Sequence, residues 1–246
     1  MKKKTLWLTS MIITLLFTLS VSSTSLAIRA SAQTIQNIQQ IGNSDNSQIK
    51  HIEILHYKII GQTFAAQSTD SGGYGLMGIS IDTSNPIKYY INYSNAPKGI
   101  ASTLETSAST WDSETSAKLF GGILGGTTAK YGKYDGKNVI TFDKYRGNPQ
   151  VIAVTSIWYN TATMKVTEFD MLFNTKYSWG NASYNSNVMD IQNIATHEFG
   201  HVVGLDDLYS DSDMLETMYG YSDYGETYKR DLYTGDINGV HNIYGN

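Results

Sequence analysis

Two histidines stand four residues apart in the segment HEFGHVVGLDDLY, residues 197–209, and an acidic residue directly follows the first of them. On an α-helix, residues i and i+4 lie one turn apart on the same face. His197 and His201 could therefore offer two imidazoles to one metal ion, and Glu198 would stand beside them. Such an arrangement can hold a zinc ion and a base for the water bound to it.

A helix that would give the histidines this spacing is predicted over residues 190–203. Its apolar residues recur at the spacing of a half-buried helix, at Ile191, Ile194, Phe199 and Val202. Gly204 marks the predicted end, because a left-handed helix cap favours glycine. The metal-binding spacing therefore falls on a segment that is independently expected to be helical.

Strands and further helices are predicted on both sides of this segment. β-branched and aromatic residues predict strands at 87–92, 139–142, 151–159 and 166–173. Apolar residues at helical spacing predict helices at 99–115 and 236–244. A glycine-rich stretch lies around 121–126. This mixture indicates an α+β or α/β-like fold.

The N-terminus has the features of a secretory signal peptide. Three lysines at positions 2–4 precede an almost entirely apolar run over 6–21, and Ala-Ser-Ala at 30–32 supplies the small residues of a cleavage site. We expect removal of residues 1–32 and a secreted, extracellular protein with no membrane attachment. The alternative is a retained membrane anchor, because the apolar run approaches the length of a short span.

Charge and cysteine content narrow the possible partners. Removing residues 1–32 takes away four basic groups and no acidic ones, so the formal net charge moves from -4 to -8. An acidic chain is poorly suited to phosphate backbones, so nucleic acid is not expected as a partner. The chain has no cysteine, which excludes disulfides, thiolate ligands and thiol nucleophiles. We expect a monomer.

The rest of the chain divides by composition. Residues 33–75 are polar and rich in Gln, Asn and Ser, apart from an apolar alternation over 52–60, and they are predicted to be a pro-region or N-terminal arm. Residues 76–246 are predicted to form the catalytic domain.

The pattern H-E-x-x-H-x-x-G-x-x-D, followed by a methionine turn, resembles the metzincin zinc endopeptidases. Residues 230–245 resemble the C-terminal helix of matrixins, and the resemblance extends over roughly 80–246. It implies a zincin fold, with a twisted mixed sheet of about five strands, an active-site helix and a C-terminal helix. It also implies one catalytic zinc ion (Zn2+).

The resemblance assigns the metal ligands residue by residue. His197 and His201 would bind zinc through imidazole nitrogens. Asp207 takes the place where most metzincins have a third histidine, an exchange also found in snapalysin-like enzymes. Asp206 is the neighbouring alternative, which the spacing disfavours. Gly204 would let the chain turn so that Asp207 reaches the metal.

Further roles follow from the same resemblance. Glu198 would be the catalytic general base, and Met218 would form the methionine turn beneath the metal. Some metzincins place a transition-state tyrosine two residues after that methionine, but Gly220 stands there in this chain. Tyr219 and Tyr221 flank this glycine, and the sequence assigns the role to neither of them.

The chain also departs from the matrixin pattern. No histidine lies between His56 and His197, so a second, structural zinc site is not expected. Matrixin zymogens are commonly blocked by a propeptide cysteine, which this chain lacks, so latency would need another ligand, such as Asp70. We expect His51, His56 and His241 to be bystanders.

A carboxylate-rich loop follows the zinc motif. Its acidic residues are Asp211, Asp213, Asp223 and Glu226. Calcium (Ca2+) could bind there, but the spacing is not that of an EF-hand, and a solvated acidic loop is the preferred interpretation.

Together these features predict a secreted zinc-dependent endopeptidase that hydrolyses proteins or peptides. If the strand over 151–159 is the sheet edge above the cleft, as in matrixins, it could pair with an extended substrate. The alternatives are a secreted non-catalytic zinc-binding or adhesion domain on a zincin fold, and a zinc hydrolase of non-peptide amides.

Overall fold

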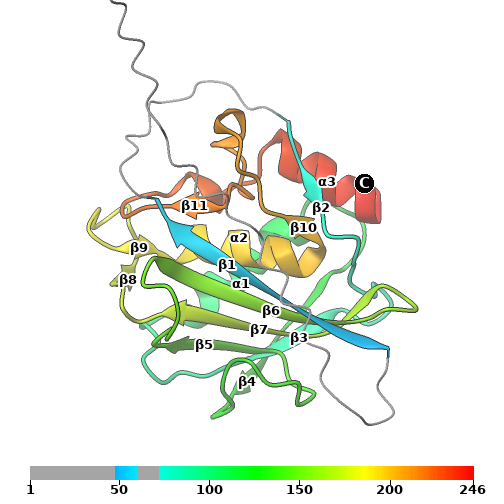
Figure 1. The fold of residues 1–246 in the computed structure, drawn as a ribbon, viewed down its shortest axis with the longest axis horizontal. Coiled ribbons are helices and arrows are strands. Elements are labelled where there is room, and N and C mark those ends of the chain that lie inside the picture. The colour runs from blue at the N-terminus through cyan, green and yellow to red at the C-terminus, as the bar shows by residue number, and fades with distance from the viewer. Residues whose placement is uncertain (1–47, 60–71) are drawn as a thin grey trace, which may run out of the picture. The chain divides into compact units, whose positions relative to one another are not determined.

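Seven strands form a mixed sheet in the computed structural model, which describes residues 48–59 and 72–246 (Figure 1). These residues belong to the unit Thr34–Asn246. Across the sheet the strands are β11 (Tyr221–Ser222), β1 (Ile49–Lys58), β6 (Val151–Asn160), β7 (Lys165–Asn174), β5 (Val139–Asp143), β3 (Ile87–Ile91) and β4 (Phe120–Gly126). Strand β6 is antiparallel to both of its neighbours, and the other neighbouring pairs of this sheet are parallel.

Shorter elements complete the described chain. The two-residue strands are β2 (Gly75–Leu76), which pairs with β10 (Leu205–Asp206), and β8 (Trp179–Gly180), which pairs with β9 (Met189–Asp190). The two 3-10 turns are η1 (Asp211–Asp213) and η2 (Tyr228–Arg230).

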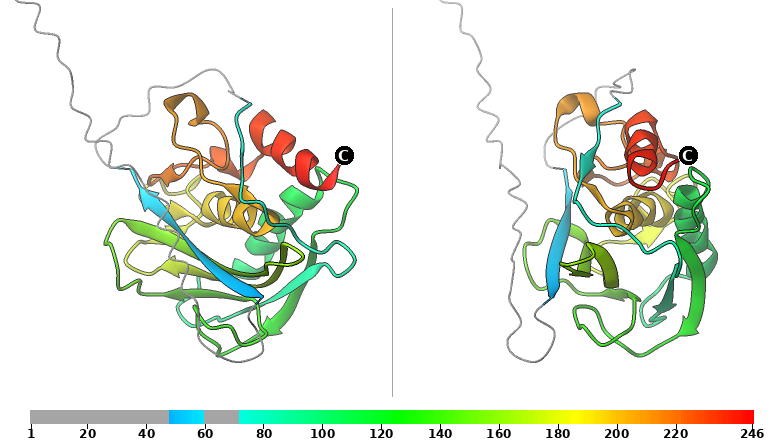
Figure 2. Two further views of the ribbon diagram at one scale, coloured as in Figure 1. Left: turned by 45° about the vertical axis from the view of Figure 1, so that its right-hand side comes forward. Right: turned by 90° about the vertical axis from the view of Figure 1, so that its right-hand side faces the viewer.

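Helices α1 (Ile100–Asp112) and α2 (Ile191–Val203) pack against each other on one face of the sheet, as the views in Figure 2 show. The Trp111 indole donates a hydrogen bond to the Thr196 carbonyl, at 2.8 Å, and joins the two helices. Helix α3 (Thr234–Tyr244) closes the chain beside β10. The core between helices and sheet is rich in aromatic residues, including Tyr89, Phe169 and Phe199.

The predicted α+β class is confirmed, with its active-site helix and C-terminal helix. Five neighbouring strands, from β6 to β4, form the twisted mixed sheet that the sequence predicts, and β1 and β11 extend it to seven. The glycine-rich stretch around 121–126 forms β4, which the sequence does not predict. Its pairing with β3 shifts register twice, and Gly122 and Gly125 have positive φ.

Strand β1 lies within the region predicted to be a pro-region or arm. It pairs antiparallel with β6, from Ile49 opposite Asn160 to Tyr57 opposite Val151. The sequence interpretation of β6 as an open sheet edge is therefore wrong for this structure, because β1 covers that edge. The division of the chain at residue 75 stays a prediction.

Two carboxylates on β7 anchor the loop before β5. Asp170 accepts backbone N–H groups from Gly132, Lys133 and Val139 at 2.8–3.2 Å. Glu168 accepts those of residues 135 and 136. Protein carboxylates thus hold this loop against the sheet.

In the part of the chain that the structure describes, no helix is long and apolar enough to cross a membrane. The predicted signal peptide, residues 1–32, and Asp70 lie outside the described residues.

Candidate metal centre

Helix α2 is buried on almost every side, so its orientation is fixed by packing all around it. The Asp190 carboxylate caps its first turn by accepting the Asn193 N–H at 2.9 Å, and it also pairs with Arg230. Gly204 ends the helix with φ of 109°, and a Cβ there would overlap the Ile79 carbonyl oxygen. The chain can therefore turn sharply after the second histidine, as the sequence predicts.

Three metal-ligating side chains converge just after this turn. The Nε2 atoms of His197 and His201 lie 3.1 Å apart, and Asp207 Oδ1 lies 3.2 and 3.5 Å from them. All three side chains are almost fully buried. Asp207 Oδ1 is buried without a hydrogen-bond partner, although both imidazoles are within reach. A buried carboxylate oxygen needs compensation, which a cation between the three groups would provide.

Backbone carbonyls orient the two imidazoles. His197 Nδ1 lies 2.8 Å from the Thr217 carbonyl, and His201 Nδ1 lies 3.0 Å from that of Leu205. Because a carbonyl only accepts, each Nδ1 must carry hydrogen, which leaves Nε2 of a neutral ring with a free lone pair. This is the second contact that metal-binding histidines almost always make.

The charges in this cluster are strongly coupled. Burial lowers the pKa of His197 to about 4. Burial also opposes a charge on His201, but Asp207 and neighbouring acceptors outweigh it and raise its pKa to about 9. The pKa of Asp207 lies well below its usual value, because the histidines outweigh the effect of burial. The donor set of two imidazoles and one carboxylate fits zinc.

Asp206 does not join the cluster. Its carboxylate accepts the Asp207 N–H at 2.9 Å, and it belongs to neither of the groups of potential metal ligands among the described residues. The structure therefore brings Asp207, and not its neighbour, to the two histidines.

Glu198 is fully buried beside the cluster and has two side-chain partners. Its Oε2 accepts the Thr155 hydroxyl at 2.5 Å, and its Oε1 lies 3.2 Å from His56 Nδ1. Burial raises the pKa of Glu198 to about 7. The expectation that His56 is a bystander is wrong, because the pairing of β1 with β6 carries this side chain to Glu198.

Met218 packs beneath helix α2. It is buried, and a Cβ on Gly200 would overlap its sulfur atom and come within 2.8 Å of Trp111. Its N–H donates to Asp236 at 3.0 Å, which fixes the turn against α3. The role of Met218 as the methionine turn stays a prediction.

Tyr209 is a site residue that sequence reasoning missed. Its hydroxyl donates to Asp207 Oδ2 at 2.9 Å, so it orients the carboxylate. Its ring also lies where a side chain at Gly220 would project. The spacing of two residues from Asp207 was visible in the sequence, but nothing there showed that the ring turns back.

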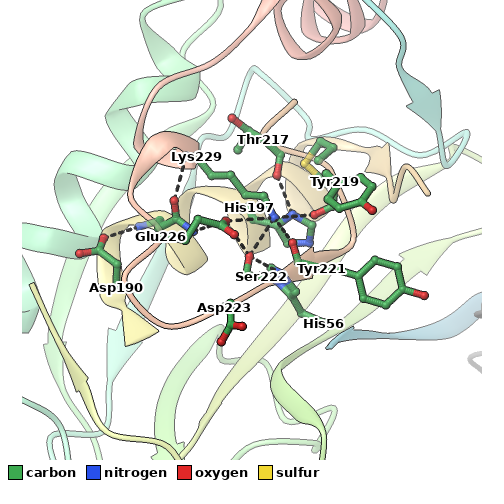
Figure 3. Close-up of polar contacts among 12 residues, drawn as sticks. His56, Asp190, His197, Thr217, Tyr219, Tyr221, Ser222, Asp223, Glu226 and Lys229 are labelled. Carbon is green, nitrogen blue, oxygen red and sulfur yellow. Dashed lines mark hydrogen bonds and ion pairs between the residues drawn. The ribbon is translucent and has the colours of Figure 1, made fainter. Parts of the chain in front are cut away.

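A buried lysine fixes the segment that follows the methionine turn, as Figure 3 shows. Lys229 Nζ donates to the carbonyls of Tyr219 and Tyr221 and to the Ser222 hydroxyl, at 2.5–2.8 Å, and pairs with Glu226 at 3.4 Å. Burial lowers the pKa of Lys229. The sequence does not predict this contact, because nothing distinguishes Lys229 from an exposed lysine in a polar segment.

The remaining predicted candidates lie apart from the cluster. Glu226 is buried in the lysine network, and Asp223 pairs with Lys58 at 2.7 Å, so the interpretation as a solvated acidic loop is wrong for these two residues. His51 stacks on Trp158, and His241 Nε2 lies 2.6 Å from a backbone carbonyl. Among the described residues, these acidic side chains belong to neither group of three or more His, Asp or Glu side chains that could hold a metal ion.

The fold and site define a metallopeptidase-type centre, with a helix that carries two histidines and a carboxylate and a third ligand after a glycine turn. Residues 128–245 match the family model of Matrixin. Residues 128–245 therefore form a matrixin metallopeptidase domain, and they contain the group of potential metal ligands His197, His201 and Asp207. No curated protein matches the chain significantly.

Proposed function

We propose that this domain is a zinc-dependent endopeptidase in which His197, His201 and Asp207 hold the metal ion and Glu198 is the general base. The observation that carries the proposal is the convergence of three buried ligand atoms, His197 Nε2, His201 Nε2 and Asp207 Oδ1, the last of which has no hydrogen-bond partner. Each imidazole is already oriented by a backbone carbonyl, so a small ion would meet ligands in place.

Zinc, when bound, supplies a Lewis acid for the peptide carbonyl and makes water more acidic. Glu198 would take the proton from the attacking water and pass it to the leaving amine. Thr155 holds Oε2 of Glu198, which leaves Oε1 as the atom that exchanges the proton. Tyr209 would keep the third ligand, Asp207, in one orientation.

We also propose that the protein acts outside the cell as a monomer, on protein or peptide substrates. The basic start, apolar run and Ala-Ser-Ala stretch of residues 1–32 support export. The acidic charge of the remaining chain supports a partner other than nucleic acid.

The test compares the purified chain with its Glu198→Gln variant for bound zinc and for hydrolysis of an unfolded protein. We expect equal zinc in both. With His56→Ala to uncover Glu198, the chain that keeps Glu198 should hydrolyse the substrate at least about 100-fold faster than the same chain with Glu198→Gln. If zinc binds but neither the wild type nor the His56→Ala chain cleaves the substrate, a non-catalytic zinc-binding or adhesion domain becomes the better explanation.

A further inference from the structure

Strand β1 lies between β6 on one side and β11 on the other, directly beside the metal centre (Figure 1). It runs antiparallel to β6 and parallel to β11. Its residues precede the matched matrixin segment, 128–245, which contains β6, β11 and all the proposed metal ligands. The strands that flank β1 and the three proposed metal ligands therefore all come from later parts of the chain than β1 itself.

One side chain of β1 enters the site itself. His56 is fully buried, with Nδ1 3.2 Å from Glu198 Oε1 and Nε2 3.0 Å from the Ser222 hydroxyl. Its ring centre lies 3.9 Å from that of His197. Figure 3 shows it beside His197 and Ser222. His56 thus contacts Oε1 of Glu198, the oxygen that would exchange the proton in the proposed reaction.

We propose that β1 is an intramolecular inhibitor, which fills the peptide-binding groove between β6 and β11 and covers Glu198 with His56. The inference rests on the proposed function and adds its regulation: the chain is latent while β1 is in place. A strand and its buried histidine would then together block the site.

The groove has room for one extended strand. An extended substrate would gain its main-chain hydrogen bonds from an open sheet edge. Here the edge of β6 pairs with β1 over the length of the strand, and the Ile59 N–H donates to the Ser222 carbonyl at 3.0 Å on the opposite side. A peptide whose carbonyl reaches Glu198 would need the space of His56, so substrate and β1 exclude each other.

Non-covalent contacts alone hold the strand. Ile52 and Ile54 are buried in the core on the same face as His56. Glu53 accepts the Tyr131 hydroxyl at 2.6 Å, and the far end is held by the ion pair of Lys58. The strand can therefore be displaced from the sheet without the cleavage of a covalent bond.

The test uses the full zinc-loaded chain and a short peptide hydroxamate, which binds zinc and extends along a peptide groove. Amide hydrogen exchange over residues 49–59 is measured with and without the probe, and probe affinity is measured for wild type, His56→Ala and His51→Ala. His51 is the matched control, because it lies on the same strand but faces Trp158.

We expect the probe to abolish the exchange protection of the amides of residues 49–59. His56→Ala should bind it about tenfold more tightly, because the covering contact is lost, and His51→Ala should stay within about twofold of wild type.

If the probe binds while residues 49–59 stay protected, and His56→Ala binds it no more tightly than His51→Ala, β1 is a permanent part of the fold and the inhibitor proposal is overturned. The proposed peptidase function would survive that result. If the probe binds none of the zinc-loaded chains, His56→Ala included, the proposed function itself fails and the inhibitor proposal fails with it.

Discussion

At the residue scale, the proposed metal site depends on a carboxylate as its third ligand and on the groups that orient this carboxylate. Asp207 is placed by the glycine turn at the end of α2, and Tyr209 holds its second oxygen. Asp206, its neighbour in sequence, instead accepts a backbone N–H. Two adjacent aspartates with the same chemistry thus have different environments, which gives a direct comparison.

Replacing each aspartate by alanine separates these roles. Asp207→Ala removes a ligand, so we expect zinc affinity to fall at least about 100-fold, whereas Asp206→Ala should change it by no more than about threefold. Competition with a chelator of known affinity measures both. Equal losses in the two variants would contradict the assignment.

Tyr209→Phe tests the second contact. The variant keeps the ring but removes the hydroxyl that holds Asp207 Oδ2, so zinc affinity should fall about tenfold while thermal stability without zinc changes little. Tyr224→Phe, at a partly exposed tyrosine, is the matched control. Unchanged affinity in Tyr209→Phe would show that the hydroxyl does not support the ligand.

At the scale of the elements, helix α2 holds its two histidines in a fixed orientation, because its neighbours pack closely around it. Gly200 faces Met218 and Trp111 so closely that no side chain fits. Close packing of this kind makes added atoms costly.

Gly200→Ala should therefore lower stability, although alanine is the better helix former. We expect a loss of about 1–3 kcal/mol in the free energy of unfolding, measured by denaturant titration. Asn238→Ala, at an exposed position of α3, should cause no comparable loss. A stabilised Gly200→Ala variant would refute the close contact.

The elements also show what the sequence could predict. Helix α2 was predictable, since its cap, apolar spacing and terminal glycine are all local signals. The zinc-motif residues are likewise close in sequence. The position of His56 was not predictable, because it depends on the register between β1 and β6, which are about a hundred residues apart. Lys229 was missed for the same reason, since its acceptors are carbonyls that only the folded chain brings together.

At the scale of the whole molecule, the chain has no disulfide, so its buried polar groups and core must hold it together. Several of these groups are carboxylates at the loops that frame the sheet. Asp170 is one of them, and burial raises its pKa to about 7 against three N–H groups that lower it. Stability should therefore depend on pH through the loop that precedes β5.

The direction follows from proton binding. Between about pH 4 and 7 the folded protein keeps a proton on Asp170 that the unfolded chain releases, so the free energy of unfolding falls as pH rises through this window. We expect the zinc-free wild type to lose roughly 5 °C more in melting temperature than Asp170→Asn between pH 5 and pH 8. Scanning calorimetry at the two pH values measures this difference. Parallel pH profiles for the two proteins would contradict the shifted pKa.

An anomalous diffraction map of the zinc-loaded full chain, recorded on both sides of the zinc absorption edge, tests the proposed metal site. We expect one strong peak within about 2.0–2.2 Å of His197 Nε2, His201 Nε2 and an oxygen of Asp207. Strand β1 should still be paired with β6. A peak at Asp206, or a zinc ion bound elsewhere while these three side chains bind none, would contradict the proposed ligand set.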